Sequence, residues 1–165
     1  MMVTLTGFMG SGKTTVGKVL ADFLGCPFMD LDDLIVKKAG KSIPDIFAQD
    51  GESAFRQLEA QVLRKTVEKY AESTAVLALG GGAVLAPASA ALLRDKTVCI
   101  YLRATLETLL ARLEGGTAGR PLADASLAER LASREPIYEK TAHVIVDTDG
   151  LSPEEVADEI IICAL

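Results

Sequence analysis

A glycine-rich segment near the amino terminus carries the clearest chemistry in this sequence. Residues 7–15 read GFMGSGKTT and satisfy the spacing G-x-x-x-x-G-K-[ST] between a short apolar run and a helical pattern. Such a loop turns backbone N–H groups toward phosphate oxygens, and the following helix N-terminus adds partial positive charge. The segment therefore predicts a site for a nucleoside triphosphate, held by Gly10, Ser11, Gly12, Lys13, Thr14 and Thr15.

Two side chains of this segment have separate expected roles. Lys13 would reach the β- and γ-phosphates, and the Thr14 hydroxyl would ligate Mg²⁺. The bulky pair Phe8 and Met9 is interpreted as packing residues. A GTPase is not indicated, because the base-reading pattern N-K-x-D is absent and DTDG, at residues 147–150, comes too late in the chain.

Three carboxylates follow the next short apolar run, in FMDLDD. Open α/β sheets bind ligands at the carboxyl ends of their strands. Asp30 and Asp32 are therefore candidates for orienting magnesium and for accepting a proton from an attacking hydroxyl. Asp33 fits better as a charge that complements the dipole of the next helix. The strand-like VIVD imitates the magnesium-positioning strand of other P-loop ATPases, but we expect Asp147 at the sheet edge, away from the glycine-rich loop.

Two arginines and a triple glycine suggest a site for an acidic small molecule. Arg56 lies in AFRQLE, out of step with the apolar stripe of its helix, and Arg134 lies in SREPIYEK. A guanidinium group binds a carboxylate through two hydrogen bonds, although each arginine taken singly fits a surface ion pair. Glycines follow an apolar strand at Gly80, Gly81 and Gly82, where either a sharp turn or a close approach of backbone to ligand would require them.

Apolar periodicity alternates between strand and helix along the chain. Strand-length runs at Ala75–Leu79, Thr97–Leu102 and His143–Val146 add to those at Val3–Thr6 and before Asp30, and helical spacing covers residues 13–24 and 51–70. Ser126 with Glu129 and Ser152 with Glu155 fit capping boxes. Residues 115–123, GGTAGRPLA, have no periodicity and predict a mobile loop with Arg120 on a lid. The pattern predicts an α/β sandwich with a mostly parallel sheet.

Composition restricts the partners of the chain. Its 165 residues fit one domain, and a net charge of -6 would repel a nucleic-acid backbone. Because no signal peptide or membrane-length apolar run is present, we expect a cytoplasmic protein that does not enter a membrane. Cys26, Cys99 and Cys163 are expected as unpaired, mostly buried thiols, and the single histidine, His143, as a structural residue.

Taken together and in order, these motifs resemble the shikimate kinase family almost from end to end. The resemblance is carried by GFMGSGKTT, DLD at residues 30–32, SIPDIF from Ser42, GESAFRQLE ending at Glu59, the triple glycine, RPL from Arg120, REPIY from Arg134 and the late VDT. It implies an ATP-dependent, magnesium-dependent transfer of a phosphoryl group to the 3-hydroxyl of shikimate, in the route to the aromatic amino acids. The implied fold is a three-layer α/β/α sandwich with a five-stranded parallel sheet in the order 2-3-1-4-5.

The resemblance also implies roles for individual residues. Asp32 contacts the shikimate hydroxyls and is the candidate base, and Asp30 supports magnesium. Arg56 and Arg134 grip the carboxylate, and the Gly80–Gly82 segment donates through the Gly81 N–H. Arg120 closes onto the phosphates with a lid at about residues 113–124, above a substrate-binding region at about residues 31–60. The family implies a monomer.

Two departures and two alternatives accompany this reading. Relatives often carry further arginines before the lid glycines and after the last strand, where Leu113, Glu114 and DTDGLSP stand here, so only Arg112 is a candidate partner for adenine. One alternative is a related small-molecule kinase such as a gluconate kinase, which would not require both Arg56 and the triple glycine. The other is an ATP-binding regulatory module without turnover.

Overall fold

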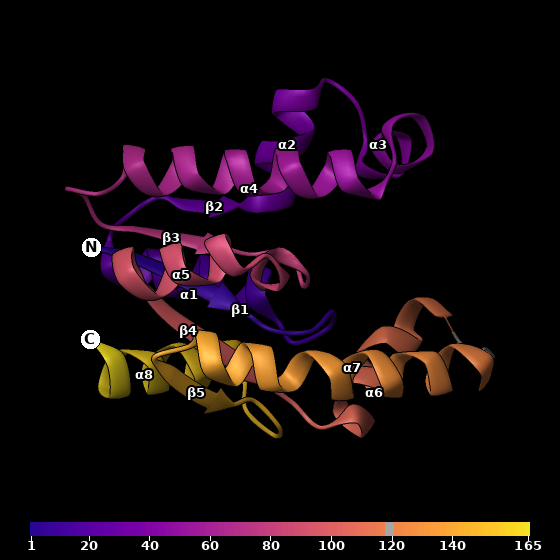
Figure 1. Ribbon diagram of the computed structural model, residues 1–165. Coiled ribbons are helices and arrows are strands. Elements are labelled where there is room, and N and C mark those ends of the chain that lie inside the picture. Colours follow the sequence, from indigo (N-terminus) through magenta and orange to yellow (C-terminus); the bar gives the residue numbers. More distant parts are fainter. Residues whose placement is uncertain (118–120) are drawn as a thin grey trace.

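The computed structural model describes the backbone of residues 1–117 and 121–165, and side chains outside residues 114–125. Its centre is a five-stranded parallel sheet in the order β2-β3-β1-β4-β5 (Figure 1). The strands are β1 (Met2–Thr6), β2 (Phe28–Asp30), β3 (Ala75–Ala78), β4 (Val98–Arg103) and β5 (Val144–Asp147). The five-stranded order implied by the resemblance is therefore confirmed.

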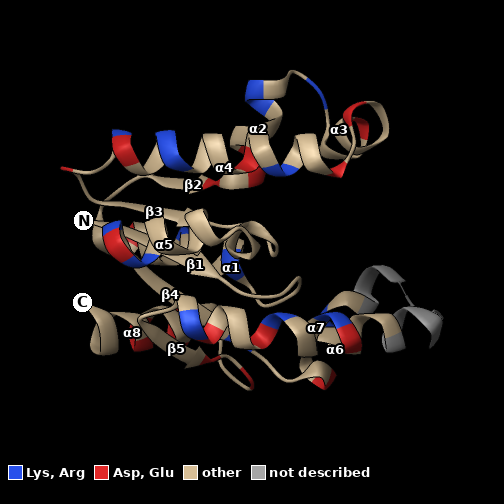
Figure 2. Cartoon of the chain, viewed as in Figure 1, with Lys and Arg blue, Asp and Glu red and all other residues tan. Residues whose placement is uncertain are grey.

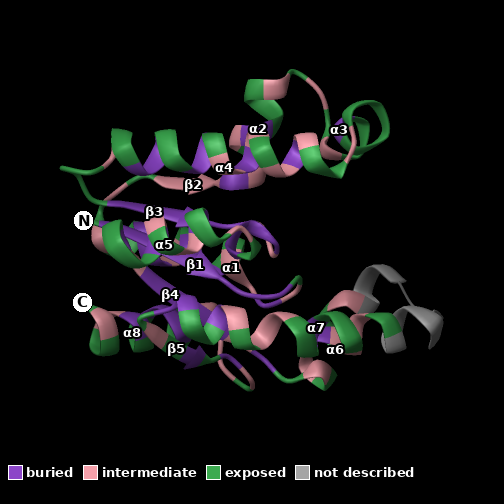
Figure 3. Cartoon of the chain, in the orientation of Figure 1, coloured by how far each residue is buried: buried purple, intermediate pink, exposed green. Residues whose placement is uncertain are grey.

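Helices cover both faces of the sheet and bury its strands. They are α1 (Lys13–Leu24), α2 (Leu31–Ala39), α3 (Ile43–Asp50), α4 (Glu52–Lys69), α5 (Pro87–Lys96), α6 (Leu106–Thr117), α7 (Pro121–Thr141) and α8 (Pro153–Ala164), with a short 3₁₀ helix at Ala83–Leu85. One hydrophobic core packs α1 and α8 against one face of the sheet. The other core packs the helices from α2 through α7 against the opposite face. Figure 3 shows that β1, β3 and β4 are buried between these layers, as expected for a parallel sheet, whereas the edge strands β2 and β5 are only partly covered.

Helix termini explain several element boundaries and correct others. Ser152 accepts from the Glu155 N–H and the Glu155 carboxylate accepts from the Ser152 N–H, so the predicted capping box of α8 is confirmed. The predicted cap at Ser126 is wrong, because Ser126 lies inside α7. The predicted loop at residues 115–123 is also wrong in part, since α6 includes residues 115–117 and α7 begins at Pro121, a residue favoured in a first helical turn.

Parallel pairing brings the ends of distant sequence segments to one edge of the sheet. The register pairs Leu5 of β1 with Ala78 of β3 and with Ile100 of β4, and Asp30 of β2 with Ala78. The glycine-rich segment after β1, the carboxylates after β2 and the glycines after β3 therefore lie beside one another. This arrangement is the physical basis of the candidate site.

The structure also bears on the cysteines and on the expectation that the chain does not enter a membrane. The three cysteines are free, but only Cys99 is buried, so the prediction of mostly buried thiols is wrong for the exposed Cys163. Within the described part of the chain, none of the helices has both the length and the apolar character to cross a membrane.

Candidate active site

The glycine-rich segment forms a tight loop between β1 and α1. Gly7, Gly10 and Gly12 have φ angles of 151°, 82° and 93°, which L-residues with a side chain rarely adopt. A Cβ atom on Gly7 would lie 2.7 Å from the Leu102 carbonyl oxygen. Gly12 directly precedes α1, so the loop leads the chain into a helix N-terminus as an anion site requires.

Lys13 closes this loop from within. Its Nζ donates to the carbonyl oxygens of Gly7 at 2.6 Å and Phe8 at 3.0 Å. Burial lowers the pKa of Lys13 to about 8, against the opposing attraction of Asp32 and Asp30. The ammonium group thus lies between the loop and both carboxylates, where a phosphate would restore its preference for the charged form.

Asp30 connects the loop to the second strand. Its Oδ2 accepts from the Thr14 hydroxyl at 2.9 Å, and its Oδ1 accepts from the Asp32 N–H at 2.9 Å. The second bond makes Asp30 the N-cap of α2. Asp33 lies in the first turn of α2, where its charge was expected to complement the helix dipole, and the side chain of Asp30 caps the same helix while also facing Thr14.

Asp32 lies one residue inside α2 and faces the triple glycine. Burial raises its pKa, the negative charge of Asp30 adds to that rise, and the Lys13 ammonium opposes it. A Cβ atom on Gly80 would lie 3.1 Å from Asp32 Oδ1. A half-buried carboxyl with a raised pKa at the end of a strand has the properties of a proton acceptor.

Arg56 is held by a carboxylate that sequence reasoning did not single out. Its Nη1 donates to Glu59 Oε1 at 2.8 Å, one helical turn along α4, and its guanidinium lies 5.2 Å from the centre of the Phe55 ring. Glu59 is only 4% exposed, and burial raises its pKa although Arg56 opposes the rise. A partly buried ion pair therefore orients the guanidinium at the acceptor side of the sheet.

Arg134 lies beside the glycine-rich loop, on α7. Its guanidinium is 5.8 Å from the centre of the Phe8 ring, and its Nη1 would be 3.4 Å from a Cβ atom on Gly81. Tyr138, one turn further along α7, donates to the Gly81 carbonyl oxygen at 2.6 Å. Arg134 thus stands on the same side of the molecule as the loop, as the sequence interpretation requires.

Each glycine of the triple glycine leaves room for one of these side chains. Gly80 borders Asp32 and Glu59, Gly81 borders Arg134, and a Cβ atom on Gly82 would lie 2.5 Å from Arg56 Nη1. None of the three has a positive φ angle. The absence of side chains, rather than an unusual backbone conformation, is what this segment supplies.

These groups line one pocket of about 350 Å³. Its charged residues are Asp32, Arg56, Glu59, Arg130 and Arg134. Its apolar wall is formed by Met9, Ile43, Phe47 and Phe55, with the triple glycine completing the lining. Met9 is 39% exposed, so its predicted packing role is wrong, whereas Phe8 is buried in the core as predicted.

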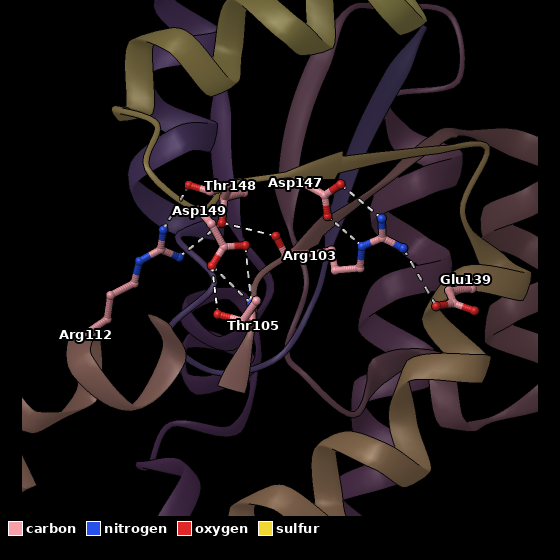
Figure 4. Close-up of polar contacts among 7 residues, drawn as sticks. All are labelled: Arg103, Thr105, Arg112, Glu139, Asp147, Thr148 and Asp149. Atoms are coloured by element: carbon pink, nitrogen blue, oxygen red, sulfur yellow. Dashed lines mark hydrogen bonds and ion pairs between the residues drawn. The ribbon is translucent and has the colours of Figure 1, made fainter. Parts of the chain in front are cut away.

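A second pocket, of about 210 Å³, lies on the other side of the loop between α1 and α8. It is lined by Ser11, Gly12 and Thr15 together with Arg112, Leu151 and Pro153. Arg112 donates to the Gly10 carbonyl oxygen at 3.2 Å. It also donates to the Thr148 carbonyl oxygen at 3.3 Å (Figure 4). The position of Arg112 agrees with its candidate role beside a nucleobase.

Asp147 has a structural partner instead of the loop. Its carboxylate accepts from Arg103 Nε at 2.6 Å and Nη2 at 3.0 Å, and Glu139 lies 3.9 Å from the same guanidinium (Figure 4). This ion pair joins the ends of β4 and β5. β5 is the edge strand, so Asp147 lies where the sequence analysis expected it.

His143 also has a structural position. Its Nδ1 accepts from the Cys99 N–H at 3.0 Å, which assigns the ring proton to Nε2, and Nε2 donates to the Arg94 carbonyl oxygen at 3.0 Å. The ring joins the start of β4 to the end of α5, far from the pockets. Arg120, by contrast, lies outside the described residues, as do the side chains of most of the expected lid.

Comparison with known proteins identifies the family. The family model described as shikimate kinase matches residues 9–164. The chain belongs to the shikimate kinase family. A shikimate kinase from Enterococcus faecalis is 43% identical over 164 residues, which cover 96% of this chain and 95% of that protein. A shikimate kinase from Geobacter sulfurreducens is 46% identical over 163 residues, which cover 96% of this chain and 87% of that protein.

Solved structures agree with this family assignment. The shikimate kinase from Acinetobacter baumannii in complex with shikimate superposes with a TM-score of 0.87 at 33% identity, covering 97% of this chain and 90% of that one. As a member of the shikimate kinase family, the protein is an ATP-dependent kinase. The family resemblance and the fold read from the sequence are both confirmed.

Proposed function

We propose that this protein transfers the γ-phosphoryl group of ATP to the 3-hydroxyl of shikimate. The observation that carries the proposal is the single pocket in which Arg56, Arg134 and Asp32 meet beside the glycine-rich loop. A loop for a triphosphate and a cationic pocket for an acidic alcohol share one edge of the sheet. Phosphoryl transfer requires mainly this juxtaposition together with neutralised charge.

The two arginines provide the recognition of the substrate carboxylate. Guanidinium groups bind carboxylates more strongly and more directionally than ammonium groups do. Glu59 fixes the orientation of Arg56, and Phe8 lies beneath the guanidinium of Arg134. The remaining wall, with Phe47 and Met9, encloses the carbon ring of the acceptor and excludes water.

Asp32 accepts the proton of the attacking hydroxyl. It lies at the floor of the acceptor pocket and interacts electrostatically with Lys13. Its raised pKa makes it a better proton acceptor than an ordinary aspartate. Lys13 and Arg120 balance the charge that develops on the transferred group.

The residues present fit a magnesium ion at Thr14 and Asp30. The Thr14 hydroxyl and Asp30 Oδ2 are 2.9 Å apart at the start of α1, and magnesium prefers such oxygen ligands. When bound, magnesium would neutralise part of the charge of the phosphate groups. Asp30 would hold it while keeping its N-cap bond to α2, so the same carboxylate positions Asp32.

The nucleobase binds in the second pocket in this proposal. Ser11, Gly12 and Thr15 present the loop to the ligand, and Arg112 and Pro153 border the base. Because all the candidate residues come from one chain, we propose that the enzyme acts as a monomer. Its place of action is the cytoplasm, where ATP is available.

A coupled ADP-release assay with Mg²⁺-ATP tests the proposal. Shikimate, quinate, gluconate and nucleoside monophosphates are offered as acceptors, and shikimate is expected to be strongly preferred. A preference for gluconate would favour the related small-molecule kinase, and binding of ATP without turnover on any acceptor would favour a regulatory module. Either result would contradict the proposed reaction.

A variant pair tests, in the same assay, the carboxylate clamp, meaning Arg56 and Arg134 together. Arg56→Ala is expected to raise the KM for shikimate about a hundredfold with little change in the KM for ATP, because a bidentate charged contact is lost. Arg64→Ala is the matched control, since Arg64 is exposed two turns further along α4 and does not line the acceptor pocket. Equal increases in both KM values for Arg56→Ala would remove this role.

A further inference from the structure

A groove lies between α2 and α4, and it shares no lining residue with the two pockets described above. Its volume is about 370 Å³, similar to that of the acceptor pocket. Leu34 and Val62 contribute its apolar floor. Four exposed lysines line it, and no acidic residue does: Lys37 and Lys38 from α2, and Lys65 and Lys69 from α4.

The lysines of this groove carry an unbalanced local charge. Among the described side chains, none of the four forms an ion pair with a carboxylate. Lys65 and Lys69 are four residues apart on one helix, a spacing at which like charges repel. Lys69 lies 5.5 Å from the centre of the Tyr70 ring, a contact that leaves its charge without a counter-charge. Figure 2 shows the blue segments on both helices.

This concentration of positive charge runs against the net charge of the protein. The whole chain carries a charge of -6, so its average field repels anions. Four lysines around an apolar floor therefore favour a ligand that has both a negative charge and an apolar surface. Such a ligand has a flat apolar body for Leu34 and Val62 and an acidic group for the lysines.

We propose that the groove between α2 and α4 binds a small aromatic organic anion. Coulomb attraction to the lysine ammonium groups selects its acidic group and is required for tight binding, and burial of its ring against the floor adds to the affinity. The size of the groove matches one ring system with a short acidic substituent. Removal of lysine repulsion by the ligand also stabilises the folded chain.

Occupancy of the groove is coupled to the acceptor pocket through the two helices that form both. α2 carries Asp32 two residues before Leu34, and α4 carries Glu59 one turn before Val62. A ligand between the helices holds them apart and moves Asp32 away from Arg56. We expect bound anion to weaken shikimate binding about fivefold, within the usual range of coupling between sites. This coupling rests on the proposed acceptor, whereas the binding does not.

Fluorescence titration with 1-anilinonaphthalene-8-sulfonate tests the binding on the full-length protein. N-phenyl-1-naphthylamine, which has the same ring system without the sulfonate, is the neutral comparison. The double variant Lys65→Glu/Lys69→Glu is compared with Lys18→Glu/Lys96→Glu, two exposed lysines on α1 and α5 that give an equal net charge. Circular dichroism establishes that both variants are folded.

The groove variant is expected to bind the sulfonate at least about tenfold more weakly, because charge reversal turns attraction into repulsion. The control variant should bind as the original protein does, and the neutral probe should bind weakly to all three. Equal loss in both variants, or equal affinity for both probes, would overturn the site. Binding of a fluorescein-labelled decaglutamate peptide without binding of the sulfonate would overturn it in favour of an acidic protein partner.

Calorimetric titration of shikimate with and without saturating sulfonate tests the coupling. Weakened shikimate binding is expected in the original protein and not in Lys65→Glu/Lys69→Glu. The same weakening in that variant would show direct competition at the acceptor pocket and would overturn the coupling, as would an unchanged or tighter shikimate affinity. A chain that binds no shikimate at all contradicts the proposed function and leaves the fluorescence result as the test of the groove.

Discussion

Gly82 lies so close to the Arg56 guanidinium that no side chain fits between them. A Cβ atom at this position would be 2.5 Å from Nη1, 2.6 Å from Nη2 and 2.8 Å from the central carbon. The guanidinium is the far end of a flexible side chain, so it would move before the backbone did. The contact therefore ties the third glycine of the triple glycine to the placement of the carboxylate clamp.

Gly82→Ala should consequently impair substrate recognition without unfolding the protein. We expect the KM for shikimate to rise about tenfold or more as Arg56 is displaced, with little change in the KM for ATP or in Tm. Steady-state kinetics and thermal denaturation check this. Gly81→Ala is the control, because its new methyl group would lie 3.4 Å from Arg134 Nη1, close to ordinary contact, and so would displace that arginine little. A larger defect in Gly81→Ala than in Gly82→Ala would contradict the explanation.

The triple glycine also shows where sequence reasoning stops. The pattern left open a sharp turn or a close approach of backbone to ligand, and the structure shows that the protein's own side chains take the space beside these glycines. Arg56 could be singled out because it falls outside the apolar stripe of α4. Glu59 could not, because it occupies a buried position on that helix and only its distance to Arg56 distinguishes it from a core residue.

The strand-end residues were predictable for a different reason. Parallel strands place their carboxyl ends together, so motifs after the first three strands had to meet once the strand pattern was known. The double role of Asp30 was not predictable, because β2 ends and α2 begins at adjacent residues and leaves no loop between them. Met9 was misassigned because an apolar residue in a loop is read as packing unless the pocket beside it is known.

Asp30 should control the pH at which the proposed base becomes active. Burial and the negative charge of Asp30 both raise the pKa of Asp32. The value of kcat/KM should therefore fall with decreasing pH as Asp32 is protonated, at a pH above the usual aspartate range. Asp30→Asn removes the neighbouring charge and keeps an oxygen for the N-cap, so this acid limb should move to lower pH. A pH profile with an unmoved limb would mean that another group limits the rate.

Asp32→Asn should separate catalysis from nucleotide binding. Loss of a positioned base typically lowers the rate by about 10² to 10⁴, so a fall in kcat within that range is expected. Calorimetry should show ADP binding close to that of the original protein, since Asp32 lines the acceptor pocket and not the pocket beside α8. A variant that keeps more than about a tenth of kcat would exclude Asp32 as the base, because the loss would fall short of a general-base contribution.

Lys13 should take up a proton when nucleotide binds at alkaline pH. Its pKa of about 8 in the free protein leaves much of it neutral at pH 8.5, and nearby phosphates favour its charged form. Since the second pKa of phosphate groups lies near 6, the ligand is almost fully ionised at pH 7.5 and above and contributes little there. Calorimetry of ADP binding in two buffers of different ionisation enthalpy should show uptake of about 0.7 proton at pH 8.5 and about 0.2 proton at pH 7.5.

The control for this measurement is Lys13→Met, titrated at higher ligand concentration to offset its weaker binding. It should show no proton uptake at either pH. Uptake that persists in this variant would assign the proton to another group. Uptake in neither protein would show that Lys13 is already fully charged in the free enzyme.

Asp147 should contribute to stability and not to magnesium binding. Its carboxylate is held by Arg103, and this contact lowers its pKa. Because the folded-state pKa lies below the unfolded one, the contribution is present at neutral pH and is lost as the pH falls through the folded-state value. Asp147→Asn should therefore lower Tm slightly at pH 7 and hardly at all in acid, as expected for an exposed pair.

The catalytic comparison with Asp30 distinguishes the two aspartates. Asp147→Asn should change kcat by less than about twofold and leave the magnesium dependence as it was, because β5 lies at the sheet edge. Asp30→Asn should raise the magnesium concentration needed for half-maximal rate, since it removes the carboxylate that faces Thr14. If the magnesium requirement rose for Asp147→Asn instead, the metal would belong to the end of β5, and the assignment of Thr14 and Asp30 would have to be abandoned.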